Sequence, residues 1–290
     1  MCPLILRRAV AALVLCFPVA VLSAVPVTVS VPPQAYLVEA IGGDRVEVSI
    51  MIEPGQSPHT FSLSPRRMMA LDDARVYFKV GHPDLAFERR FVQHVQDARR
   101  DVRVVDLADG VELMAMDDHA DHHDHSHGET DPHLWVSPRI MRSAAERVAD
   151  ALTEVDPDGA EHYRAGLQQF QSDVDALDDE LQTLFGQLER RRFVVNHPAW
   201  GYLARDYGLE QVAIESGGRD PSPAELARFI DAAKDEGIDV IFVQRGFSER
   251  SANTIAREID AVVKVADPLA QDWLKNLREI GAAIREAVDS

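Results

Sequence analysis

The chain has little of several features that mark common protein classes. Its 290 residues include only two cysteines, Cys2 and Cys16. Beyond the first two dozen residues, no apolar run approaches the roughly 20 residues that a membrane-spanning helix needs. Lys and Arg number 30 against 48 Asp and Glu, which gives a formal net charge of −18. No basic patch can dominate such a surface, which argues against nucleic-acid binding. The charge suits a soluble protein that attracts cations, without selecting among them.

The N-terminus has the pattern of a signal peptide at 1–24. Two arginines precede an apolar run of fourteen residues at 9–22, and Ala24 gives a small residue at a cleavage point. Lipidation of Cys16 is an alternative, although Leu15 stands where a small residue is wanted. Cleavage after Ala24 removes both cysteines, which leaves neither a disulfide nor a thiolate metal site. It also removes two arginines, taking the charge from −18 to −20. We therefore predict a periplasmic protein.

Strand-like and helix-like segments alternate through both halves of the mature chain. The predicted strands are 27–31, 46–52, 75–80 and 102–106 in the first half, and 193–196, 212–215, 239–244 and 261–266 in the second. Helices begin between them at recognisable starts, such as the capping box that Ser222 and Glu225 form. Such alternation implies βαβ units and parallel pairing. We predict an α/β fold of two similar lobes, each a mostly parallel four-stranded sheet with flanking helices, bridged by one long helix.

The most periodic segment of the chain joins these halves. Its apolar residues alternate spacings of four and three: Tyr163, Leu167, Phe170, Val174, Leu177, Leu181, Leu184 and Leu188. This pattern predicts a helix of roughly 30 residues, about 45 Å long. A coiled-coil dimer is one interpretation. A single helix across both lobes of a monomer fits better, because βα units flank it. The predicted limits are 25–157 for the N-terminal lobe, 158–190 for the linking helix and 191–290 for the C-terminal lobe.

Histidine is concentrated in one acidic stretch at 117–128. Five of the eleven histidines fall within nine residues there: His119, His122, His123, His125 and His127. Imidazole and carboxylate together suit borderline transition metals, above all zinc. Low-complexity histidine segments, however, bind metals loosely and in interchangeable geometries. The stretch is therefore interpreted as a loop with a secondary, low-affinity metal site, the alternative being a solvated acidic loop without function.

Four other residues stand in or near the positions where a parallel sheet places its ligands, beyond the carboxyl ends of strands. His59 follows the strand at 46–52, and His133 follows the histidine stretch. His197 and Asp267 directly follow predicted strands of the second half. Each alone has an ordinary explanation as a turn or packed residue. His82 also follows a predicted strand. Two candidates in each half could hold one metal from both sides.

Four ordered motifs and the long helix give the chain a family resemblance over 25–290. The motifs are Pro54-Gly-Gln-Ser-Pro-His59-Thr-Phe61, Asp131-Pro-His133-Leu-Trp135, Asn196-His197-Pro-Ala-Trp-Gly-Tyr-Leu203 and Asp267-Pro-Leu269. They resemble the metal-binding proteins of ABC importers for zinc and manganese, especially the zinc-specific, ZnuA-like members. The resemblance implies two lobes bridged by a rigid helix. It also implies that His59, His133, His197 and Asp267 face a metal cleft.

The resemblance also bears on the metal. Manganese members place a glutamate where His197 stands, and they usually lack the histidine-rich insertion. Three imidazoles and one carboxylate favour Zn²⁺. Asp267 is the least secure ligand, because water completes the shell in some zinc members; Glu53 and Glu215 are the fallback carboxylates.

The expected function is therefore that of a solute-binding protein, not an enzyme. It would capture Zn²⁺ in the periplasm and deliver it to an ABC permease in the inner membrane, with no catalytic substrate. A manganese or other divalent-metal importer component is the alternative. A zinc hydrolase is disfavoured, because no H-E-x-x-H motif occurs and four protein ligands leave no open position. An adhesin role is sometimes attached to relatives, and nothing in the sequence indicates it.

Overall fold

The computed structural model describes residues 24–289 apart from 54, 55, 59, 72, 99, 116–129, 216–218, 220 and 246–248, with the backbone alone at 66, 67 and 70. The predicted signal peptide, save its last residue, and the whole histidine-rich stretch at 117–128 lie outside the described residues. So does His59. None of the helices in the described ranges is long and apolar enough to cross a membrane.

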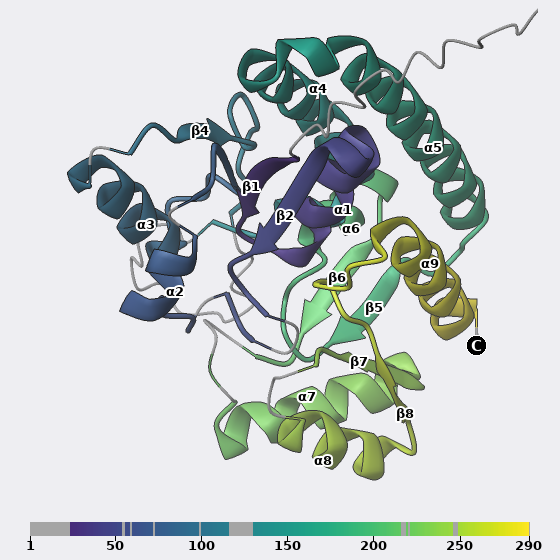
Figure 1. The fold of residues 1–290 in the computed structure, drawn as a ribbon. Helices are drawn as coiled ribbons and strands as arrows, with labels where there is room; N and C mark the ends of the chain where they lie inside the picture. Colours follow the sequence, from purple (N-terminus) through teal and green to yellow (C-terminus); the bar gives the residue numbers. More distant parts are fainter. Residues whose placement is uncertain are drawn as a thin grey trace, which may run out of the picture.

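The first half of the chain forms one parallel sheet in the order β2-β1-β3-β4. Its strands are β1 (Val25–Val29), β2 (Val46–Ile50), β3 (Val76–Lys79) and β4 (Arg103–Asp106). Helices α1 (Pro32–Gly42) and α4 (Pro138–Val155) pack on it, and α2 (Pro65–Ala70) and α3 (Ala86–Asp97) lie on the other side in Figure 1. This is the predicted N-terminal lobe.

The second half repeats the arrangement with a parallel sheet in the order β6-β5-β7-β8. Its strands are β5 (Arg192–Val195), β6 (Glu210–Ala213), β7 (Val240–Val243) and β8 (Val262–Val265). Helix α9 (Trp273–Asp289) contacts β5 on one face, and α8 (Arg250–Ile259) contacts β7 and β8, with α7 (Pro223–Glu236) packed against α8. The predicted fold of two similar lobes is confirmed.

Helix α5 (Ala160–Gly186) bridges the lobes, as the sequence predicts. It packs on α1 and α4 of the first lobe and on α9 of the second, and Figure 1 shows it running along one side of the molecule. Most of its apolar seam is buried, from Tyr163 to Leu181. The seam is thus used within the chain, which removes the reason for a coiled-coil dimer. The exact lobe limits at 157, 190 and 191 stay predictions.

The main hydrophobic core runs through both lobes without interruption. It includes side chains of β1 and β3, of α5, and of β5 and α9. A second, smaller cluster lies between the C-terminal sheet and helices α7 and α8. Because buried side chains are packed to crystal-like density, a core shared by both lobes resists their separation.

Several element bounds differ from the sequence expectations by two or three residues. Strand β1 ends before Ser30, because the backbone N–H groups of Ser30 and Val31 donate to Gln34 Oε1 and turn the chain into α1. Strand β6 begins at Glu210, two residues earlier than predicted, because it pairs with β5 from Arg192 onward. Helix α6 (Gly201–Tyr207) was not predicted, since seven residues are too few to show a helical period.

Candidate metal centre

The carboxyl ends of the C-terminal strands carry four polar side chains in a row. Following the sheet order, Glu215 comes after β6, His197 after β5, Gln244 after β7 and Asp267 after β8. In a parallel sheet these ends meet at one edge, where ligands collect. The edge therefore combines an imidazole with oxygen-bearing side chains.

His133 is fixed by a carboxylate two residues before it. Asp131 Oδ1 accepts hydrogen bonds from the backbone N of His133 at 2.9 Å and from its ring Nδ1 at 2.7 Å. Both residues are buried. Since a carboxylate accepts, Nδ1 carries the ring proton and Nε2 keeps its lone pair. This is the tautomer in which a histidine binds a metal through Nε2.

His197 has the same arrangement with a different partner. Its Nδ1 lies 2.9 Å from Glu215 Oε2, and the other carboxylate oxygen accepts from Asn196 Nδ2 at 2.8 Å. Burial lowers the pKa of His197, and this outweighs the opposing effect of Glu215. The neutral imidazole, which is the metal-binding form, is thus favoured. The fallback ligand Glu215 is in contact with the His197 ring and is placed to orient it.

The two rings meet at the boundary between the lobes. The centroids of His133 and His197 are 5.3 Å apart, and the planes are tilted by 78°. One histidine belongs to the first half of the chain and the other to the second. The structure therefore brings together two of the four predicted ligands, each backed by its own carboxylate.

Of the other two predicted ligands, the structure describes only Asp267. His59 is outside the described residues. Asp267 lies at the end of β8, where its Oδ1 accepts from the backbone N of Leu269 at 3.0 Å. Burial raises its pKa, and Arg245, 3.9 Å away, opposes that rise. Within the described ranges, no three His, Cys, Asp or Glu side chains are grouped as a complete metal site. Asp267 thus stays a predicted ligand.

Two tryptophans tie the lobes together beside these residues. Trp135 Nε1 donates to the carbonyl oxygen of Pro268 at 2.8 Å, and Trp273 Nε1 donates to the carbonyl oxygen of Trp135 at 2.7 Å. Trp135 also contacts the ring of His133 edge-on, with centroids 5.3 Å apart. These two hydrogen bonds connect the segment that carries His133 with the segment that follows Asp267.

Asp131 is held from the second lobe as well. Tyr202 of α6 donates its hydroxyl to the carbonyl oxygen of Asp131 at 3.0 Å. The Asp131 carboxylate lies so near Gly201 that a Cβ there would stand 2.6 Å from Oδ2. The glycine is required by this close approach. Sequence reasoning did not single out Asp131 as a supporting group, although a carboxylate two residues before a candidate histidine is a usable signal.

His82 is buried at the end of β3, where its position had made it a candidate. Its Nε2 is 2.8 Å from Thr130 Oγ1, and its Nδ1 accepts from the backbone N of Asp84. Thr130 in turn forms an antiparallel bridge with Ala115. Both ring nitrogens of His82 are thus engaged, and the described residues that flank the histidine-rich stretch, Ala115 and Thr130, pair here.

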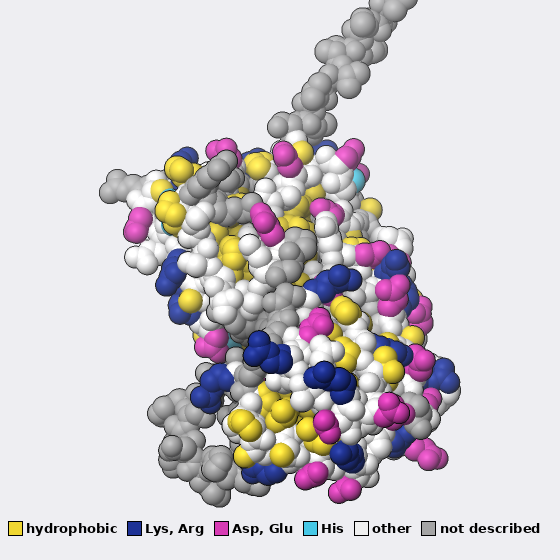
Figure 2. Space-filling view, turned by 90° about the horizontal axis from the view of Figure 1, so that it is seen from below, with side chains coloured by type: hydrophobic (Ala, Val, Ile, Leu, Met, Phe, Trp, Pro, Cys, Tyr) yellow, Lys and Arg dark blue, Asp and Glu magenta, His cyan; other side chains and the backbone are white. Residues whose placement is uncertain are grey.

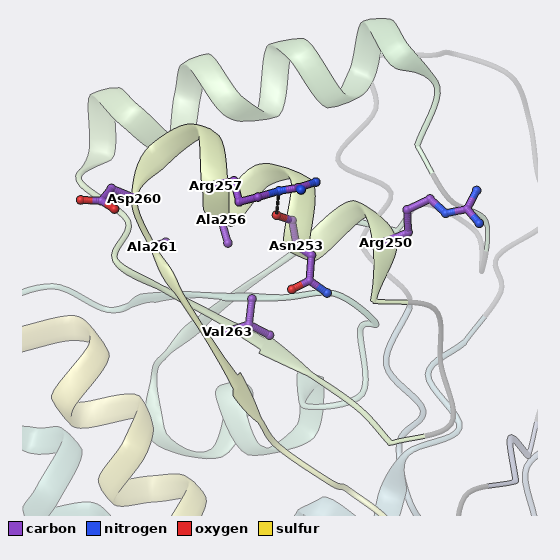
Figure 3. A pocket seen from close by; sticks show the side chains of 7 residues that line it. All are labelled: Arg250, Asn253, Ala256, Arg257, Asp260, Ala261 and Val263. Atoms are coloured by element: carbon purple, nitrogen blue, oxygen red, sulfur yellow. Dashed lines mark hydrogen bonds between the residues drawn. The ribbon is translucent and has the colours of Figure 1, made fainter.

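One hollow elsewhere among the described residues is a poorer place for a metal. A surface hollow beside α8 and β8 is lined by Arg250, Asn253, Ala256, Arg257, Asp260, Ala261 and Val263 (Figure 3). It has one carboxylate, no imidazole and two arginines, so it would repel a cation. On the face seen in Figure 2, acidic and basic side chains are interspersed. The paired histidines are the better candidate.

Two α/β lobes bridged by a long helix, with buried imidazoles from both at their boundary, define a solute-binding protein whose cargo is a metal ion. A family model described as zinc-uptake complex component A, periplasmic (ZnuA), matches residues 27–287, so the chain belongs to this family. The family consists of solute-binding components of metal ABC importers, not of enzymes, and acts outside the cytoplasm with a membrane permease.

Comparisons with known proteins agree. A crystal structure of ZnuA is 37% identical, with a TM-score of 0.84, over 92% of this chain and 100% of that chain. The high-affinity zinc uptake system protein ZnuA of Bacillus subtilis is 27% identical over 70% of this chain and 65% of its own length. The manganese-binding lipoprotein MntA of Halalkalibacterium halodurans is 27% identical over 68% of this chain and 63% of its own length. Relatives thus include both zinc and manganese binders.

Proposed function

We propose that the mature chain captures Zn²⁺ in the periplasm and delivers it, as a monomer, to the permease of an ABC importer. The observation that carries the proposal is the pair of buried, carboxylate-oriented imidazoles, Asp131–His133 and Glu215–His197. A metal-binding histidine almost always donates its other ring N–H to such an oxygen. His59 completes the proposed set of imidazoles, with Asp267 or a water as the fourth ligand.

Ligand chemistry favours zinc over manganese for this site. Imidazole nitrogens suit Zn²⁺, whereas carboxylate, carbonyl and water oxygens suit Mn²⁺. His197 is one of the two histidines in ring contact. By the family resemblance, manganese-binding members have a glutamate at this position. A site of three imidazoles should therefore hold zinc against an excess of manganese.

The histidine-rich stretch at 117–128 is proposed as an accessory. His119, His122, His123, His125 and His127 would bind zinc weakly and in several geometries. The described residues that flank the stretch, Ala115 and Thr130, pair beside His82. Zinc collected on the stretch would thus be held only a few residues from His133.

Equilibrium titration with a chromophoric chelator, with Zn²⁺ and Mn²⁺ in competition, tests this function. The wild-type mature chain should bind one zinc tightly and more zinc weakly. His133→Ala and His197→Ala should lose the tight component and keep the weak one. Deletion of 117–128 should do the reverse. His162→Ala is the matched control. His162 is an exposed histidine on α5, and its ring is hydrogen-bonded to the carbonyl oxygen of Gly42, not to a residue of the candidate site.

Two results would contradict the proposal. Loss of the tight component on deletion of 117–128 would place the main site in the stretch. Displacement of bound zinc by equimolar manganese would make the chain a manganese carrier.

A further inference from the structure

Gln244 occupies a central place at the ligand-bearing edge of the C-terminal sheet. It directly follows β7, which lies between β5 and β8 in the sheet. The backbone N of Asn196 donates to the Phe242 carbonyl at 2.7 Å, and the backbone N of Ala266 donates to the Val243 carbonyl at 2.9 Å. The chain at Gln244 is thus flanked by the segments that carry His197 and Asp267.

The strand register indicates which face Gln244 shares. Val195 is paired with Phe242, and both belong to the main core, whereas Val194 and Val243 belong to the smaller cluster on the opposite face. Side chains two residues apart on a strand point to the same side. Gln244 therefore follows Phe242 on the main-core side of β7, next to the end of β5 from which the chain continues to His197.

The side chain of Gln244 carries a buried acceptor that the described residues do not satisfy. It is only 4% exposed, and its Oε1 has no hydrogen-bond partner among the described residues. Glu215 at the same edge, by contrast, accepts on both carboxylate oxygens, and Asp267 Oδ1 accepts from Leu269. A buried acceptor without a donor destabilises the folded chain. A donor that arrives with the bound metal ion would remove this cost.

We propose that Gln244 contacts the cargo: its Oε1 accepts a hydrogen bond from a water molecule bound to the metal ion that His133 and His197 hold. This inference rests on the proposed function. Water on a divalent metal is polarised and a strong donor, so it satisfies the orphaned amide oxygen. An amide does not take up the proton, which suits a carrier that must hold a hydrated ion without activating its water for hydrolysis.

Substitution by methionine separates this role from a purely structural one. Gln244→Met keeps the approximate volume and removes the whole carboxamide, the NH₂ group as well as the unsatisfied oxygen. The metal-free protein should then melt higher, by about 2–4 °C for a chain of this size, because the unsatisfied acceptor is gone. Zinc affinity should fall about 5- to 30-fold, because the metal-bound water loses its acceptor. The melting temperature of the metal-free protein should thus rise while the zinc affinity falls, whereas a general packing defect would lower both.

Gln244→Glu supplies the converse test. It restores an acceptor, now charged, so zinc binding should equal or exceed that of the wild type while the metal-free protein melts lower. Unchanged zinc affinity in Gln244→Met, or a lower melting temperature of its metal-free form, would overturn the proposal. A different result would refute the proposed function itself, namely zinc binding by His197→Ala as tight as that of the wild type.

Discussion

Glu215→Gln tests whether the buried carboxylate behind His197 sets the ring for metal binding. In the wild type, Glu215 accepts from His197 Nδ1 at 2.9 Å and from Asn196 Nδ2 at 2.8 Å. A carboxamide has one accepting and one donating end, so it cannot serve both neighbours. If its oxygen stays with Asn196, its NH₂ group donates to Nδ1 of His197. The ring proton then moves to Nε2, which can no longer bind a metal.

The opposite amide orientation is also costly. The NH₂ group would then face the donor Nδ2 of Asn196, and that hydrogen bond would be lost. Replacement of a group that orients a metal-bound histidine typically costs 10–100-fold in metal affinity. We therefore expect zinc to bind 10–100-fold more weakly to Glu215→Gln, which corresponds to about 1.4–2.8 kcal/mol.

The assay is a zinc titration against a chelator of matched affinity, with melting of the metal-free protein to verify folding. Glu210→Gln is the matched control, since Glu210 begins β6, the strand that Glu215 follows, but is exposed and pairs with Arg192. Its zinc affinity should equal that of the wild type. If Glu215→Gln also bound zinc within twofold of the wild type, the assignment of Glu215 as the group that orients His197 would be refuted.

Three further predictions concern the same site. Gly201→Ala would push a Cβ to within 2.6 Å of Asp131 Oδ2, so displacement of Asp131 should weaken zinc binding about tenfold and cost about 1–2 kcal/mol of stability, measured by titration and denaturant unfolding. Trp273→Phe removes the indole bond to the Trp135 carbonyl and should lower the unfolding free energy by about 1–2 kcal/mol, whereas an unchanged value would show that the bond contributes nothing. Burial lowers the pKa of His197, so the unfolded chain takes up a proton near pH 6.5 that the folded chain refuses. The metal-free protein should therefore lose stability as pH falls below about 6.5, and His197→Gln should lose less than the wild type between pH 7.5 and 5.5.

The architecture was predictable because local patterns agreed with one another. Alternating short apolar runs and capped helices indicated two parallel sheets, and the seam from Tyr163 to Leu188 indicated the bridging helix. The capping box of Ser222 and Glu225 is present as expected. Bounds were less predictable, as at β1, where the side chain of Gln34 ends the strand by bonding the backbone of Ser30.

The candidate metal ligands were predictable from the sequence, whereas the residues that surround and orient them were less so. Strand-end placement selected His197, and the motif after the histidine stretch selected His133; the rings of the two lie in contact. Glu215 had been considered as a ligand, whereas its partner is the ring of His197. That relation depends on two strands, β5 and β6, lying side by side in register, and no local sequence pattern encodes it. Gln244 was missed for the same reason, since an unsatisfied acceptor is visible only once its neighbours are in place.

The most direct test of the central claim is anomalous diffraction at the zinc absorption edge from crystals of the zinc-loaded mature protein. The account predicts a strong peak between the lobes, within about 2.0–2.1 Å of the Nε2 atoms of His133 and His197. Nδ1 of each ring should still face Asp131 or Glu215. A fully occupied peak bound only by residues of 117–128, with His133 and His197 away from the metal, would contradict it.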